Sequence, residues 1–320
     1  MELLEESEEG GYPLEYLLSR IRGKRTSLIK DWEYLVRAEN PLEALSSPRH
    51  GKAGFDSADA LWVLLLSEFR WVFSQMDRTL RDIFRPFFLY TELRTLFVCL
   101  RYGAVNDSVK KDHVLVRSLF SKKFKRVLRR SKDIPEAVGD IEDVFMSFSA
   151  GFRGIREVFL KDGLRGVEHM LTNTYLEHTM RTELHPLIKE FFIRIIDARN
   201  LIALYKYLRW EMEGTPRFVK GGRISERVLG EIKERENIFG VIPVLRTVTG
   251  VEIRKPDATG VENALYRGIT RFLRRAGRET SGIGFILDYL WRCSMEVRNM
   301  GVLLYGRDAE RDAIREELVL

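Results

Sequence analysis

The sequence predicts an all-α protein in which three similar helical modules follow one another. Only 9 of the 320 residues are proline, and the helix-favouring residues Leu, Arg, Glu, Lys and Ala are plentiful. Apolar residues recur at three- and four-residue steps, which places them on one face of a helix. A related apolar helix also recurs at long intervals, which indicates an internal repeat.

Composition limits the class of protein. With 45% hydrophobic and 31% charged residues the chain can bury a core, so wholesale disorder is not expected. The two cysteines, Cys99 and Cys293, lie far apart, which favours the reducing cytosol over a disulfide framework. The N-terminus is acidic, unlike a signal peptide, and apolar runs such as 61–66 fall short of the ~20 residues of a spanning helix. Any membrane association is therefore expected through a partner or at the membrane surface.

The first third of the chain is predicted to hold two helical stretches. One spans 12–32 along a single apolar stripe, and a loop rich in Pro and Gly follows over 40–54. The other spans 57–101, where Pro86 is expected to break or kink the helix. The polar and glycine-containing stretch 102–108 predicts a boundary between modules.

A basic helix is predicted over 109–131. Positions 110–132 hold ten Lys or Arg residues against a single acidic residue, Asp112. Phe120 and Phe124 fall on its apolar stripe and are expected in the core. The cations either face acidic partners, such as phosphates, lipid headgroups or acidic protein, or form a solvated helix face. The net charge of the chain, +6, does not decide between these.

Helices are expected over most of the remaining chain. Pro135 suits the first turn of one helix, and Ser225 can cap another. The stretch 239–253 is the only one predicted to be a loop or short hairpin, and helices over 261–276 and 285–305 precede a short C-terminal one. Breaks between helices are expected at Gly163, Gly166, 185–186 and 214–222.

Three stretches carry the internal repeat. Residues 92–102 align with 200–210 through Leu, Leu, aromatic, Leu, Arg and aromatic in step. Residues 299–307 follow the same pattern with one residue fewer before the Arg. Any two amphipathic helices can be aligned to some extent, which is the alternative to a true repeat. The predicted modules span 1–106, 107–213 and 214–320.

The second and third copies also share a polar pair. Asp197 precedes Asn200 by three residues, and Glu296 precedes Asn299 by the same spacing. Residues three apart lie on one helix face and can hydrogen-bond to neighbouring helices, so these pairs are expected to form a polar framework. The candidates for structural or interaction roles are Asp197, Asn200, Arg209, Glu296, Asn299, Arg307, Lys122, Lys123, Lys125 and Arg126.

No catalytic, cofactor or metal site is predicted. The chain lacks the Gly-x-x-x-x-Gly-Lys-Ser/Thr loop that cradles phosphates. Residues 282–284 hint at a dinucleotide turn but lack its third glycine and its preceding strand. His169 and His178 each follow a Glu, but a nine-residue spacing puts them on opposite faces of a helix, where they could not share a metal ion.

The repeated stretches at 92–102, 200–210 and 299–307 and the polar pairs at 197/200 and 296/299 resemble the C subunits of V-type ATPases. This family of central-stalk subunits is called d in the eukaryotic enzyme. The resemblance covers almost the whole chain, and its motifs are structural and degenerate. Departures occur at Leu89 and Glu92, which replace the polar pair in the first module, and at Pro86, Gly301 and the heavy basic run. The matching stretches are 16–28, 167–168, Leu171, Tyr175, Asp197, 200–201, 261–265, 285–290, 296–299, 305–307 and 314–318.

The resemblance implies a fold, a role and partners. Members fold as three similar helical-bundle domains in a pseudo-threefold, funnel-like arrangement. The wide end sits on the membrane rotor ring of proteolipid subunits, and the other side receives the central-shaft subunits. The chain is thus expected to be a non-catalytic central-stalk subunit, without a cofactor, that couples the soluble head to proton or sodium transport. It would be cytoplasmic and peripheral to the membrane, with no nucleic acid bound.

Two other classes remain open from the residues alone. A basic helical protein could bind nucleic acid through 110–132, in which case binding would weaken steeply with salt. An unrelated helical scaffold would show no threefold internal similarity.

Overall fold

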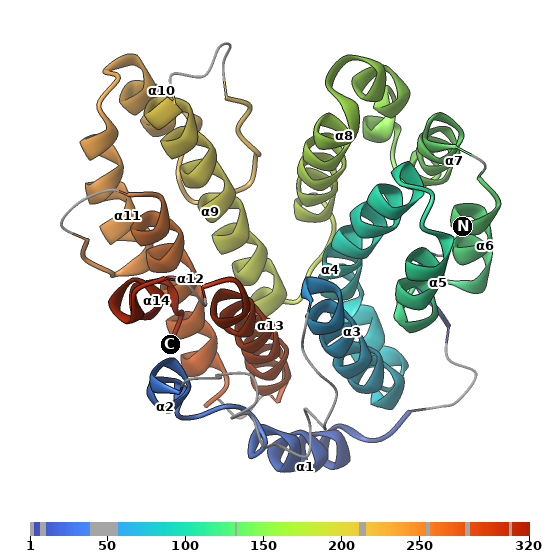
Figure 1. Cartoon of the computed structure of the whole chain (residues 1–320), viewed down its shortest axis with the longest axis horizontal. Helices are drawn as coiled ribbons and strands as arrows, with labels where there is room; N and C mark the ends of the chain where they lie inside the picture. Colours follow the sequence, from blue (N-terminus) through green and yellow to red (C-terminus); the bar gives the residue numbers. More distant parts are fainter. Residues whose placement is uncertain are drawn as a thin grey trace. The chain divides into compact units, whose positions relative to one another are not determined.

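A computed structural model describes residues 3–6, 11–38, 57–131, 133–210, 216–253, 257–278, 282–306 and 309–320. The predicted all-α class is confirmed, because these residues form α-helices and short 3₁₀ turns (Figure 1). Extended pairing among the described residues is limited to two isolated β-bridges, Leu4 with Phe120 and Tyr12 with Met76.

The chain divides into two compact units. Unit 1 combines Met1–Tyr12 with Leu66–Lys189, and unit 2 combines Pro13–Leu65 with Glu190–Leu320. One point of division lies between Tyr12 and Pro13, and the other two fall within α3 (Ala58–Gln75) and α9 (Pro186–Trp210), so these two helices contribute to both units. Each unit therefore joins an N-terminal segment to a later part of the chain. The three-module division at 106 and 213 stays a prediction.

Unit 1 is built around α4 (Arg78–Ala104), which packs on the other long helices of the unit. Side chains in its core include a cluster of phenylalanines in which Phe69, Phe73, Phe87 and Phe88 meet edge to face or tilted. The remaining elements are α5 (Ser108–Arg117), α6 (Lys122–Arg130), α7 (Ile134–Met146), η1 (Ala150–Phe152) and α8 (Ile155–Met180) (Figure 1).

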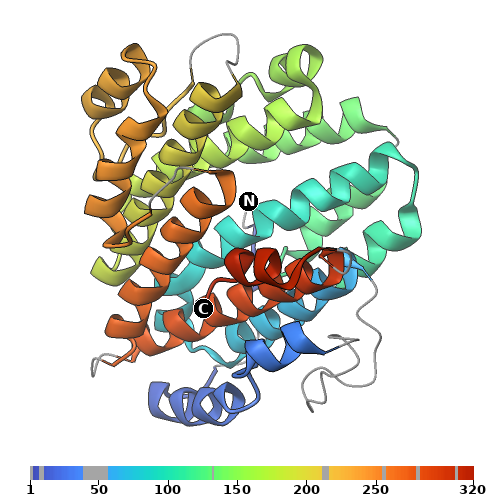
Figure 2. The same cartoon turned by 60° about the vertical axis from the view of Figure 1, so that its left-hand side comes forward.

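Unit 2 is built around the antiparallel neighbours α12 (Ala258–Ala276) and α13 (Ile283–Tyr305). The C-terminal helix α14 (Arg311–Glu317) packs on both of these and on α2 (Trp32–Arg37), which belongs to the N-terminal segment (Figure 2). The other elements are α1 (Leu14–Arg25), α10 (Glu226–Glu234), η2 (Ile238–Gly240) and α11 (Val241–Thr249).

Helix boundaries were predicted correctly where a capping residue or a proline begins the helix. The Ser225 side chain accepts a hydrogen bond from the Val228 amide and begins α10, as predicted. Pro135 lies in the first turn of α7, also as predicted. Asp77, Asp107, Ser121 and Asp133 cap four more helices in unit 1 in the same way.

The predicted basic helix over 109–131 is wrong, because the segment forms two helices, α5 and α6. Ser118 and Leu119 leave the helix to hydrogen-bond with the buried Glu92, and Phe120 pairs with Leu4. Ser121 then caps α6. The prediction that Phe120 and Phe124 are core residues is confirmed, since both are buried and stacked edge to face.

The stretch 239–253 is helical rather than a loop or hairpin. Its β-branched residues favour strand, but Val241 and Leu245 sit one turn apart and are both fully buried against α9, α10 and α12 in the core of unit 2. Packing on one face therefore overrides a weak local preference. Gly250, at φ 65°, ends α11 in the left-handed region.

Other boundaries also differ from expectation. The predicted helix over 12–32 is two helices, because α1 ends at Arg25 and α2 begins at Trp32. The predicted helix over 57–101 is two helices, because α3 ends at Gln75 and α4 begins at Arg78. Pro86 does not break α4, which continues through it. Gly163 interrupts α8 with φ 64°, as predicted, but Gly166 does not.

Two glycines on α13 predict opposite effects of adding a methyl group. A Cβ at Gly284 would lie 2.2 Å from the carbonyl oxygen of Ala276, so Gly284→Ala should destabilise the chain by ~1–3 kcal/mol. At Gly301 no described atom lies within 4 Å of a Cβ, so Gly301→Ala should stabilise by ~0.5–1 kcal/mol. Urea unfolding of both variants measures the difference, and equal midpoints would contradict this packing.

Candidate functional site

A buried polar side chain occupies the same position in each of the three repeated helices. These side chains are Glu92 on α4, Asn200 on α9 and Asn299 on α13, with exposures of 1%, 2% and 1%. A polar group this deeply buried must be hydrogen-bonded to avoid a large desolvation cost. Each of the three meets that need by binding the backbone of a segment that comes later in the chain.

The two asparagines make the same pair of hydrogen bonds. The Asn200 side chain donates to the Val219 carbonyl at 2.9 Å and accepts from the Val219 amide at 2.8 Å. The Asn299 side chain donates to the Val319 carbonyl at 2.9 Å and accepts from the Val319 amide at 3.0 Å. We call this arrangement, in which a helix side chain holds one residue's backbone, the backbone clamp.

Glu92 forms a variant of the clamp in the first repeat. Its carboxylate accepts from the Leu119 amide at 2.7 Å and from the Ser118 hydroxyl at 2.9 Å. A carboxylate cannot donate, so a hydroxyl takes the place of the second backbone group. Burial raises the pKa of Glu92, although the Leu119 amide and the Ser118 hydroxyl oppose that shift. Glu92, which departs from the family pattern, therefore keeps the clamp but uses two acceptor oxygens in place of one donor and one acceptor.

A carboxylate one turn earlier extends the clamp in the second and third repeats. Asp197 accepts from the amides of Arg223 and Ile224 at 2.8 and 3.0 Å. Glu296 accepts from the amide of Ile29 at 2.7 Å. In the third repeat the second segment thus comes from the N-terminal part of unit 2. Burial raises the pKa of Asp197, against the effect of its two backbone hydrogen bonds.

In each repeat a capped helix follows one of the backbone segments that the polar side chains hold. Ser121 caps α6 shortly after Leu119, and Ser225 caps α10 directly after Ile224. Asp31 caps α2 two residues after Ile29. The three repeats share a held backbone segment, a cap and a short helix, but in the third these precede the repeated helix α13 in the chain. In the third, α2 supplies the short helix.

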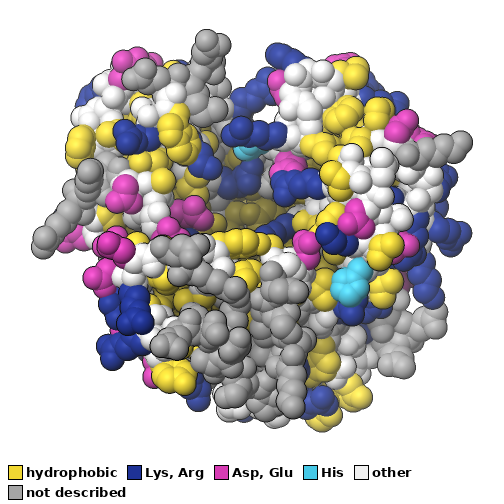
Figure 3. All heavy atoms as spheres, in the orientation of Figure 1, with side chains coloured by type: hydrophobic (Ala, Val, Ile, Leu, Met, Phe, Trp, Pro, Cys, Tyr) yellow, Lys and Arg dark blue, Asp and Glu magenta, His cyan; other side chains and the backbone are white. Residues whose placement is uncertain are grey.

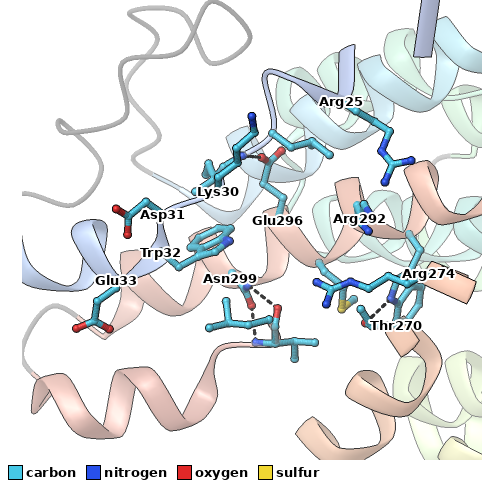
Figure 4. Close-up of a pocket in the computed structure, with 16 residues that line it drawn as sticks. Arg25, Lys30, Asp31, Trp32, Glu33, Thr270, Arg274, Arg292, Glu296 and Asn299 are labelled. Carbon is cyan, nitrogen blue, oxygen red and sulfur yellow. Dashed lines mark hydrogen bonds between the residues drawn. The ribbon is translucent and has the colours of Figure 1, made fainter. Parts of the chain in front are cut away.

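A cavity of about 590 Å³ adjoins the third clamp, within unit 2. Glu296, Asn299, Ile29 and Val319 all line it, so the clamp residues form part of its wall. Figure 4 shows the three lining arginines apart from Lys30 and the carboxylates of the cavity. Asp31 and Glu33 lie toward α2, and the lining arginines, Arg25, Arg274 and Arg292, lie at the other end.

One buried carboxylate stands among these arginines. Asp288, 1% exposed, accepts with Oδ2 from Arg292 Nε at 2.8 Å and pairs with Arg25 Nη2 at 3.1 Å. Its other oxygen, Oδ1, has no hydrogen-bond partner among the described residues. Burial lowers the pKa of Arg25 and of Arg274, and the charge of Arg292 acts on both in the same direction.

The basic candidates separate by burial. Lys125 is buried, pairs with Glu5 at 2.7 Å and donates to the Ser118 carbonyl at 2.7 Å. It therefore fastens the N-terminal residues of unit 1. Lys122, Lys123 and Arg126 are exposed on α6, on the edge where Figure 3 shows many Lys and Arg side chains.

The remaining candidates lie near helix ends. Arg209 is exposed close to the end of α9, and Arg307 lies outside the described residues. Within the described ranges no three His, Cys, Asp or Glu side chains group as metal ligands would. The thiol of Cys99 is buried, which raises its pKa and disfavours the reactive thiolate. None of the described helices is both long enough and apolar enough to cross a membrane.

Sequence reasoning missed the arginine group and the role of Glu92. Arg25, Arg274 and Arg292 are too far apart in sequence for any spacing rule to join them. The i, i+4 pair Asp288–Arg292 was a local signal, but such pairs are common on helix surfaces. Glu92 aligns with Asn200 in the repeat, and this alignment was the signal from which its role could have been predicted.

Comparison with known proteins adds one match. A family model described as ATP synthase (C/AC39) subunit matches residues 17–317. No curated protein matches the chain.

The backbone clamp predicts a matched effect at two positions. Asn200→Ala and Asn299→Ala each leave a buried valine amide and carbonyl unpaired, which costs ~1–3 kcal/mol per group. Both variants should unfold at clearly lower urea concentrations than the parent chain. Lys206→Ala, an exposed change on α9, serves as control and should shift stability by less than ~0.5 kcal/mol. Asparagine variants that unfold like this control would rule out the clamp.

The raised pKa of Glu92 predicts a pH dependence of stability. A carboxyl whose pKa is higher in the folded than in the unfolded chain favours folding at low pH and loses that contribution as pH rises. The free energy of unfolding of the parent chain should therefore fall as pH rises from the ordinary pKa of glutamate to the raised pKa of Glu92. Glu92→Gln keeps an acceptor for the Leu119 amide without a charge, so it should be more stable than the parent at neutral pH and equal near pH 4. Urea unfolding across pH measures this, and parallel curves would contradict it.

Proposed function

We propose a coupling role from the premise that this chain belongs to the ATP synthase (C/AC39) subunit family, whose model spans residues 17–317. In this role the chain is the non-catalytic central-stalk subunit of a V-type ATPase or ATP synthase. It links the central shaft of the soluble head to the membrane rotor ring and thereby to proton or sodium transport. The match across nearly the whole chain is the observation that carries this function.

The repeated clamps support the three-module arrangement that the role requires. Glu92, Asn200 and Asn299 fall in the modules at 1–106, 107–213 and 214–320, one in each. Each holds a later backbone segment by two hydrogen bonds. We infer three related modules around a pseudo-threefold axis, which suits a partner that is itself a symmetric ring.

A torque-bearing body must resist local opening, and the clamps provide that resistance. The segments at 119–120, 219–224 and 319 lie outside the α-helices. Buried side chains tie each of them to a long helix, so the segment cannot loosen without exposing unpaired polar groups. This rigidity needs no reactive centre, which agrees with a non-catalytic subunit.

The partners proposed are the proteolipid subunits of the ring and the subunits of the central shaft. The chain would lie in the cytoplasm and associate with the membrane through the complex. Lys122, Lys123, Arg126 and Arg209 are exposed cations that could contact acidic groups of these partners. No cofactor is proposed. Nucleic acid is not favoured, since the phenylalanine of α6, Phe124, is buried and offers no ring for base stacking.

Reconstitution of the complex tests this function. The tagged chain, expressed with the ring and shaft subunits of its own ATPase, should co-purify with them, and alone it should hydrolyse no ATP. In vesicles carrying the ring, the soluble head should pump ions only when the chain is present, and adding it back should restore pumping. Robust ATP hydrolysis by the isolated chain, or full pumping without it, would disprove the role.

A further inference from the structure

The arginine end of the unit 2 cavity is assembled from three helices. Arg25 ends α1, Arg274 lies in the last turn of α12, and Arg292 lies in α13. Figure 4 shows their guanidinium groups gathered at one end of the cavity, whose volume is about 590 Å³. The side chains of Arg25 and Arg292 are 26% and 30% exposed, so a ligand can reach them.

The charge of this group is not balanced by the described residues around it. Asp288 is the carboxylate paired with it, and a single oxygen serves both Arg25 and Arg292. The side chain of Arg274 makes no hydrogen bond and no ion pair with any of the described residues. Burial and the like charges of Arg292 and Arg278 lower the pKa of Arg274, against the opposite charge of Asp288. Three guanidinium groups around one carboxylate leave two positive charges unmatched.

The other carboxylates of the cavity are already engaged elsewhere. The Asp31 side chain caps α2, and Glu296 holds the Ile29 amide. Glu33 pairs with Arg315 and Arg37, away from the three arginines. These carboxylates keep their charge, and Lys30 lies beside them, but their printed contacts are not with the three arginines. The excess of positive charge is therefore local to the arginine end, where an external anion can bind.

We propose that Arg25, Arg274 and Arg292 form a binding site for a phosphoryl group. Two unmatched positive charges suit a phosphate dianion, and guanidinium groups bind phosphate oxygens through paired, charge-assisted hydrogen bonds. Asp288 acts as a positioning residue, because it fixes the orientation of Arg25 and Arg292 without facing the ligand. Leu28, Trp32 and Met295 line the cavity beyond the arginines and offer an apolar surface to whatever the phosphoryl group is attached to. The ligand is either free phosphate or a phosphorylated small molecule.

Calorimetric titration of the full chain, with ionic strength held constant by chloride, tests this site. One arm uses inorganic phosphate and the other ADP, and saturable binding in either arm is the expected result. Binding of similar strength in both arms identifies a single phosphoryl group as the ligand. Tighter binding of ADP, which adds a second phosphoryl group and adenosine, shows that the site also contacts groups beyond the first phosphoryl. Both outcomes support the site, whereas no saturable binding in either arm overturns it.

Arg274 is the residue to change, since it has no partner of its own among the described residues. Arg274→Gln should weaken binding by ~10- to 100-fold, as expected for the loss of charge-assisted hydrogen bonds, and Arg274→Lys should weaken it less. Arg275→Gln is the matched control: it removes an exposed arginine of the same helix turn that does not line the cavity. Equal binding by the Gln variants at 274 and 275 would overturn the proposal. Thermal unfolding without ligand checks that all three variants are folded.

Discussion

Hydrogen bonding between a buried helix side chain and an irregular backbone segment is the interaction on which this fold depends. Helices satisfy their own peptide groups, but the segments that connect them across a core do not. Asn200 and Asn299 solve this with one donor and one acceptor each, which match the two groups of a single valine. Glu92 reaches the same end with two acceptors. Short helices can then start at fixed places, because the residues before their caps are held.

The third clamp also shapes the cavity of unit 2. Glu296 binds the N-terminal segment at Ile29, which brings Trp32 and the charged residues of α2 to the wall formed by α12 and α13. On the far side, Asp288 draws Arg25 and Arg292 together while Arg274 is left without a partner among the described residues. The same part of the molecule is therefore fixed by hydrogen bonds at one end and left electropositive at the other.

The sequence predicted best where the physical cause was local. Capping by Ser225, the position of Pro135 and the burial of Phe120 and Phe124 follow from residues within a turn or two of each other. It failed at 118–121, where Glu92, far earlier in the chain, draws the backbone out of a helix. It failed again at 239–253, where burial of Val241 and Leu245 outweighs the strand preference of β-branched residues.

By itself the sequence determined the helical class and the helix positions of the aligned polar residues, because helix periodicity is set by neighbours three and four residues apart. It also placed Asp197 and Glu296 one turn before the asparagines. Only the tertiary structure decided which backbone each side chain holds, that Glu92 stands in for an asparagine, and that Ile29 completes the third clamp. It alone brought Arg25, Arg274 and Arg292 together. These pairings join residues far apart in the chain, where the choice of partner depends on packing and burial of the whole unit and no local spacing encodes it.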